Sequence, residues 1–241
     1  MTKSLVPSLD QLRSLGYAML CGVFDAETIE SLADRLTATL QGGHDISILR
    51  SRGQTYGSRN LLESLPEVSE LPRCATLREF VTAVLGTNAG IVRVLYFDKP
   101  PDRSWSLPWH KDRTIAVKEN DLPSGCFCKP TQKAGIPHVE APVWLLENML
   151  TLRVHLDAMT EENGPLSVIP GSHRVDCESD HAPITLRAGV GDVLAMRPLL
   201  SHSSSNSRPG TSMHRRIIHL ELAAGAELPD GYEWYSFVPL V

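Results

Sequence analysis

IVRVLYF, residues 91–97, is the stretch that decides the fold class, because it is rich in the β-branched and aromatic residues that form strands. Runs of the same style follow at 114–117, 151–156, 166–169, 193–196 and 215–222. Turn-forming residues separate them, among them Pro100-Pro101, Asn163-Gly164-Pro165 and Arg208-Pro209-Gly210. Many short strands separated by such turns predict an antiparallel sandwich or barrel.

The first part of the chain favours helices instead. Asp25 is a suitable N-cap for a helix over residues 26–40, whose apolar stripe consists of Ile29, Leu32, Leu36 and Leu40. A further helix is predicted over residues 75–85 and ends at Gly86, while residues 17–23 form a short strand-like run. Helices followed by strands indicate a mainly β fold with α-helices flanking it at the N-terminus.

The length of 241 residues fits one domain, 1–241. We expect a mainly helical N-terminal layer over residues 1–88 and a β core over residues 89–241. Within this core, residues 119–142 contain four prolines and two glycines and are expected to form a long loop. A loop of that length in a compact domain often acts as a lid.

Composition and charge exclude several classes of protein. The net charge of −5 provides no basic surface, so nucleic acid is not expected as a partner. Five irregularly spaced cysteines argue against a disulfide framework and favour a reducing compartment. The start of the chain shows no apolar signal segment, and no stretch approaches the roughly eighteen apolar residues of a membrane span. We therefore expect a cytoplasmic protein without a membrane partner.

A histidine followed two positions later by an acid is a possible metal chelate, because residues i and i+2 of a strand share a face. The sequence contains four such pairs: His110/Asp112, His138/Glu140, His155/Asp157 and His219/Glu221. The second lies in the proline-rich segment, and the fourth lies on the last predicted strand. The third stays open as an alternative, because residues 151–156 have a clear strand pattern. The first is preferred, because several strands can fit between it and His202.

His110, Asp112 and His202 together match a 2-His-1-carboxylate arrangement, which binds one face of non-heme Fe(II) and leaves three positions open. A lone histidine at a strand end is more often a surface group than a ligand. Arg215, at the start of the next strand, changes this reading, because its planar guanidinium suits a carboxylate-bearing cosubstrate.

These residues, with the segment 163–173, Gly191-Asp192-Val193 and His202-x-Ser204-x-Asn206, resemble the phytanoyl-CoA dioxygenase family of Fe(II)/2-oxoglutarate-dependent oxygenases. The motifs occur in the family's order, and the resemblance covers nearly the whole chain. It implies a double-stranded β-helix, or jelly roll, with helices packed on one side, so that residues 89–241 become the jelly-roll core.

The resemblance also implies roles for single residues. His110, Asp112 and His202 match the iron ligands of the family. Arg215 matches the arginine that pairs with the distal carboxylate of 2-oxoglutarate. It is preferred to Arg216 because its distance from Ala223 and its register suit the family pattern, and adjacent strand residues face opposite ways, so that one of the two points elsewhere.

Two more positions are implied to contact the cosubstrate. Ser204, two residues beyond the iron histidine, matches a position that often contacts the same carboxylate. Arg153 falls where a side chain can approach 2-oxoglutarate. The segment 163–173 is expected to be a structural turn.

The implied reaction is hydroxylation of a small-molecule substrate by O2, with decarboxylation of 2-oxoglutarate to succinate. Asp112 favours hydroxylation, because related halogenases lack this carboxylate and leave room for chloride. Lys111 stands where many members carry Gln, and the segment 119–142 matches no substrate class, so the substrate and the oligomeric state stay open. The alternatives are a non-catalytic jelly-roll ligand-binding protein and a cupin-type metal isomerase.

Overall fold

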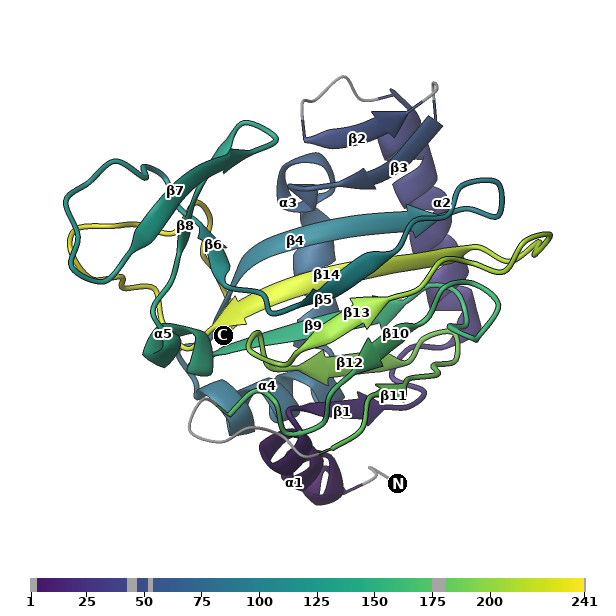
Figure 1. The fold of residues 1–241 in the computed structure, drawn as a ribbon, viewed down its shortest axis with the longest axis horizontal. Coiled ribbons are helices and arrows are strands. Elements are labelled where there is room, and N and C mark those ends of the chain that lie inside the picture. The colour runs from purple at the N-terminus through teal and green to yellow at the C-terminus, as the bar shows by residue number, and fades with distance from the viewer. Residues whose placement is uncertain (1–3, 43–46, 52–53, 175–180, 241) are drawn as a thin grey trace.

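The computed structural model describes residues 4–42, 47–51, 54–174 and 181–240 (Figure 1). All its strand pairings are antiparallel. The main sheet has the order β1 (Tyr17–Leu20), β12 (Val193–Met196), β9 (Met149–His155), β14 (Arg215–Ala223), β4 (Gly90–Lys99), β3 (Gln54–Ser58) and β2 (Ile48–Ser51), with β15 (Val238–Pro239) also paired to β4.

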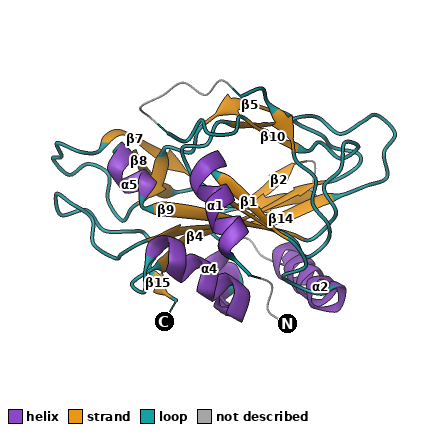
Figure 2. Cartoon of the chain, turned by 90° about the horizontal axis from the view of Figure 1, so that it is seen from below, coloured by secondary structure: helices purple, strands orange, loops and turns teal. Residues whose placement is uncertain are grey.

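Two smaller sheets complete the β structure. One has the order β11 (Ile184–Thr185), β10 (Leu166–Val168), β13 (His202–Ser204) and β5 (Leu107–His110). The other has the order β6 (Thr114–Ala116), β8 (Ile136–Glu140) and β7 (Cys128–Lys133). Figure 2 shows β5 and β10 on one side of the main sheet and the long helices on the other.

The helices of the first part of the chain cover the outer face of the main sheet. They are α1 (Val6–Leu15), α2 (Ala26–Gly42), α3 (Leu61–Ser64), a 3-10 helix (Pro66–Arg73) and α4 (Ala75–Leu85), while α5 (Val143–Glu147) precedes β9. Buried side chains of α1, α2 and α4 share one apolar core with β4, β9 and β14. The expected N-cap is present, because the Thr28 N–H donates to Asp25 Oδ1 at 2.8 Å. The prediction of a mainly β fold with flanking N-terminal helices is confirmed. The same part of the chain also contributes β1, β2 and β3 to the main sheet.

The strands of the main sheet direct polar residues away from the helices. In β14, Ile218 and Leu220 join the helix-facing core, whereas His219 and Glu221 line a cavity on the opposite face. The strands β9 and β4 alternate in the same way. The inner face of a deeply buried sheet therefore carries charged side chains, and these build the candidate site.

The segment 119–142 is not the long loop that we expected. It contains β7 and β8, which form a hairpin across Ala134 and Gly135, two residues with positive φ. Such a pair suits the tight turn of a hairpin. Pro130 lies where the register of β7 shifts, so the strand tolerates its missing N–H. Prolines and glycines here therefore shape a hairpin and do not exclude strands.

Gly191 in the Gly191-Asp192-Val193 motif links the end of β9 to Phe24 in the segment after β1. Its N–H donates to His155 O at 2.9 Å, and its carbonyl accepts from the Phe24 N–H at 3.1 Å. Its φ of 78° and the contact that a Cβ would make with the Phe24 carbonyl oxygen both require glycine. The carboxylate of Asp192 accepts from Gly22 N–H at 2.7 Å. The motif is therefore structural.

We expect Gly191→Ala to lower the free energy of unfolding by about 2–4 kcal/mol, because it adds a backbone clash to left-handed strain. Urea denaturation followed by circular dichroism measures this change. Gly210→Ala is the matched control, since Gly210 has a φ of 81° and open space at the Cβ position. Equal losses in the two variants would contradict the clash.

Candidate metal centre

The pairing of β5 with β13 brings two distant histidines together, because His202 lies opposite His110 in the ladder. Their ring centroids are 4.2 Å apart. Asp112 follows β5, and its backbone N–H donates to Pro198 O at 2.9 Å. Its carboxylate oxygens lie 3.9 Å from His110 Nε2 and 3.7 Å from His202 Nε2. The three ligand atoms lie within 4.8 Å of one another, close enough to hold one ion.

Backbone carbonyls orient both imidazoles. His110 Nδ1 lies 2.7 Å from Pro108 O, and His202 Nδ1 lies 2.9 Å from Leu200 O. A carbonyl only accepts, so each Nδ1 carries the proton and each Nε2 offers a lone pair toward Asp112. Burial lowers the pKa of His202, which keeps the ring in its neutral, metal-binding form. In the described parts of the chain, these residues form the one group of histidines and acids with metal-binding spacing.

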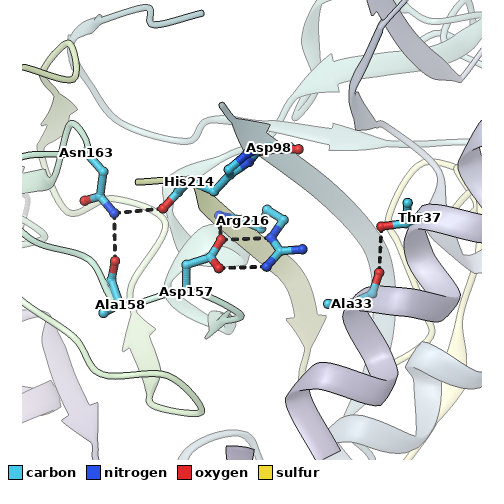
Figure 3. A network of polar contacts seen from close by, with 8 residues as sticks. All are labelled: Ala33, Thr37, Asp98, Asp157, Ala158, Asn163, His214 and Arg216. Atoms are coloured by element: carbon cyan, nitrogen blue, oxygen red, sulfur yellow. Dashed lines mark hydrogen bonds and ion pairs between the residues drawn. The ribbon is translucent and has the colours of Figure 1, made fainter. Parts of the chain in front are cut away.

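The alternative pair His155/Asp157 does not form a chelate. Arg216 holds the Asp157 carboxylate from Nε at 2.9 Å and from Nη2 at 2.8 Å (Figure 3). Burial opposes ionisation of Asp157, but these hydrogen bonds outweigh it and lower its pKa. Among the other pairs, Glu140 binds Lys129 at 2.6 Å and Arg113 at 3.3 Å. His219 and Glu221 lie 3.8 Å apart and line the same cavity, but within the described ranges no third histidine, cysteine or acid completes a metal-binding group with them.

A cavity of about 400 Å³ opens beside the candidate metal ligands. The sequence-predicted residues His110, Asp112, Arg153, His202, Ser204 and Arg215 all line it. His219 and Glu221, which the sequence offered only as a possible metal chelate, also line it. The remaining lining residues were not found from the sequence, namely Leu49, Tyr56, Arg59, Arg93, Leu95, Phe97, Trp105, Leu107, Thr114, Lys133, Leu166, Ser203 and Ile217. A signal for Arg93 was its charge inside the otherwise apolar run 91–97.

Arg215, Arg153 and Ser204 place polar side chains in this cavity. Arg215 and Arg153 are each 6% exposed. Within the described ranges, Arg215 Nε and Nη1, Arg153 Nε and Ser204 Oγ make no hydrogen bond. Burial and, to a smaller extent, the nearby charge of Arg153 together lower the pKa of Arg215 to about 9. Two buried cations with free donors suit a bound anion.

Arg216 lies on the other side of the strand. It pairs with Asp157, as Figure 3 shows, and does not line the cavity. The alternation along β14 therefore places Arg215, and not Arg216, in the cavity, as the register argument predicted.

A comparison with protein families adds to this geometry. Residues 12–217 match the model of the family described as phytanoyl-CoA dioxygenase. The chain belongs to this family. The resemblance seen in the sequence is therefore confirmed, and this phytanoyl-CoA dioxygenase family member is a 2-oxoglutarate-dependent oxygenase of the non-heme iron class. A search of curated protein sequences finds no match.

Solved structures show the same fold as this family member. AviO1 from Streptomyces viridochromogenes Tue57 is 21% identical, with a TM-score of 0.66, over 95% of this chain and 99% of that one. EctD from S. alaskensis with 2-oxoglutarate and 5-hydroxyectoine is 19% identical, with a TM-score of 0.69, over 91% and 76%. The epimerase SnoN from nogalamycin biosynthesis is 17% identical, with a TM-score of 0.66, over 94% and 84%. The predicted jelly roll is thus confirmed.

No described helix of this family member is long and apolar enough to cross a membrane.

Proposed function

We propose that the protein is a dioxygenase that hydroxylates a small-molecule substrate with O2 while 2-oxoglutarate is decarboxylated to succinate. The observation that carries this proposal is the convergence of His110, Asp112 and His202 in the cavity where Arg215 Nε and Nη1 have no hydrogen-bond partner among the described residues. The overall reaction balances, because one oxygen atom enters the alcohol and the other enters succinate, with CO2 as the remaining product.

His110 and His202 would hold Fe(II) through their Nε2 atoms, and Asp112 would hold it through a carboxylate oxygen. The donor set fits the ion, since two neutral imidazoles and one carboxylate are the ligands of non-heme Fe(II) oxygenases. The carbonyls of Pro108 and Leu200 fix the tautomers, so little reorientation is needed on binding.

Arg215 would hold the distal carboxylate of 2-oxoglutarate, and Ser204 would donate a hydrogen bond to the same group. Arg153, the second buried cation, adds positive charge at this end of the cavity. The fit rests on donors that have no partner within the described residues. An anion that satisfies them removes a desolvation cost of several kcal/mol.

Bound iron and 2-oxoglutarate supply the activation of O2. The chain supplies the positions of the ligands, a cavity between the sheets that limits water, and side chains that orient the substrate. Hydroxylation is the outcome that Asp112 favours, because its carboxylate occupies the position that halide ligation needs. Structural neighbours include the epimerase SnoN, so the product itself has to be identified.

Anaerobic addition of Fe(II) and 2-oxoglutarate is expected to produce a visible metal-to-ligand charge-transfer band, because both groups bind side by side in the cavity. A cupin-type isomerase or a non-catalytic binding protein would show no such band. His202→Ala should abolish the band, whereas His155→Gln, in the rival pair, should keep it. A missing band in the wild-type protein would overturn the proposal.

Hydroxylation is tested separately. Succinate release is measured with a series of candidate metabolites, and mass spectrometry of each product shows whether an oxygen atom has been added.

A further inference from the structure

Three further cations line the cavity, and the proposed chemistry uses none of them. Arg93 comes from β4, Arg59 directly follows β3, and Lys133 ends β7. Glu221 on β14 is the acid beside them, opposite Arg93 in the ladder. These four residues are called the second charged cluster below.

Arg93 is the best-defined member of the second charged cluster. Its side chain is 6% exposed, and its Nη1 lies 3.6 Å from Glu221 Oε1. Its Nε and Nη2 are buried and have no hydrogen-bond partner among the described residues. A guanidinium carries five N–H donors, and donors left idle in a buried place are costly. The side chain is therefore built to bind something more than Glu221.

The cations of the second charged cluster repel one another. Burial lowers the pKa of Lys133, and the charges of Arg93 and Arg59 lower it further. Burial and the charge of Arg93 also lower the pKa of Arg59. Lys133 Nζ donates to Thr114 Oγ1 at 2.7 Å, which is a neutral partner. Two carboxylates of the described cavity act on Lys133, namely Glu221 and the candidate metal ligand Asp112. With Asp112 assigned to the metal, Glu221 is left to face the three cations.

Glu221 alone does not balance this charge. Burial raises its pKa to about 6, although the neighbouring cations act to lower it. The bound cofactors supply no spare negative charge, because Fe(II), Arg153 and Arg215 together carry more positive charge than Asp112 and 2-oxoglutarate carry negative charge. The second charged cluster keeps a surplus of positive charge next to the place where the substrate has to lie.

We propose that the substrate carries an anionic group, a carboxylate or a phosphate, that binds to Arg93 and Lys133, with Arg59 adding positive charge. This inference rests on the proposed function, because it assigns the cavity's remaining volume to a substrate. Planar guanidinium donors match both anions. Tyr56 and Trp105, whose rings are 5.8 Å apart, line the same cavity. Their aromatic rings can pack against an apolar part of the same substrate.

Benzoate, phenyl phosphate and neutral benzamide are suitable probes. They are titrated by calorimetry into anaerobic protein saturated with Fe(II) and 2-oxoglutarate, so that Arg215 is already occupied. We expect benzoate or phenyl phosphate to bind at least about tenfold more tightly than benzamide, and the better of the two identifies the anion. Lys133→Gln and Arg93→Gln should each weaken anion binding about tenfold while the charge-transfer band is kept. Lys129→Gln, an exposed lysine of the same strand, is the matched control.

Equal binding of benzamide and both anions would overturn the inference, as would anion binding that neither variant weakens. Loss of the charge-transfer band on adding benzoate would also overturn it, since the anion would then occupy the 2-oxoglutarate site. If the band never forms, the proposed function fails separately. The effect of Lys133→Gln on benzoate binding to the protein alone then still decides the anion site.

Discussion

Asp112→Ala is expected to abolish 2-oxoglutarate turnover while the fold stays intact. The substitution removes the one carboxylate of the candidate metal centre, which lies 3.9 Å from His110 Nε2 and 3.7 Å from His202 Nε2. Substitution of a group that merely orients a metal ligand costs about 10–100-fold, so loss of the ligand itself should cost about a hundredfold or more. Succinate release at saturating Fe(II) and 2-oxoglutarate measures the effect.

Glu140→Ala provides the control for this prediction. Glu140 is also the acid of a His-x-acid pair, but its partners Arg113 and Lys129 are exposed and lie outside the cavity. Turnover in this variant should stay near the wild-type value. Circular dichroism of both variants checks the fold, and unchanged succinate release in Asp112→Ala would refute the assignment of the metal centre.

Arg215→Ala should raise the 2-oxoglutarate concentration needed for half-maximal turnover by about thirtyfold or more. The buried distal carboxylate would lose a charge-assisted pair, a loss of about 2 kcal/mol or more. Arg215→Lys should recover only part of the affinity, because an ammonium cannot form the planar fork. Turnover measured against 2-oxoglutarate concentration, with the charge-transfer band as a second readout of binding, checks both variants.

Arg216→Ala separates binding from stability. Arg216 binds Asp157 outside the cavity, so its loss should lower the free energy of unfolding and leave the 2-oxoglutarate requirement nearly unchanged. Equal effects of the two alanine substitutions on that requirement would show that the alternation along β14 does not decide which arginine serves the cosubstrate.

Much of the fold could be predicted, because its signals are local. The apolar stripe of α2 and the β-branched run of β4 depend on neighbouring residues only, and both elements lie where the sequence placed them. The β7–β8 hairpin was missed because its turn, Ala134-Gly135, lacks the usual asparagine or aspartate and its strands contain prolines. Local rules treated those prolines as loop residues.

The candidate site was predictable to a more limited extent. Strand parity showed that only one of Arg215 and Arg216 faces the cavity, and the family resemblance selected Arg215. Parity left four His-x-acid pairs, and only the pairing of β5 with β13 brings His110 to His202. The second charged cluster depends on the register that sets Glu221 against Arg93. Strands so far apart in sequence do not reveal that register through composition or period, so the cluster became visible only in the fold.

The β7–β8 hairpin has a consequence for how this enzyme could acquire new substrates. It delivers Lys133 to the cavity from a small sheet that contains no residue of the candidate metal centre. Lys133 therefore reaches the cavity on a separate hairpin, whereas Arg93 and Arg59 come from β4 and from the residue after β3. Exchanging the turn and the strand ends of this hairpin should change which anionic substrates the enzyme accepts while the residues of the candidate metal centre stay in place.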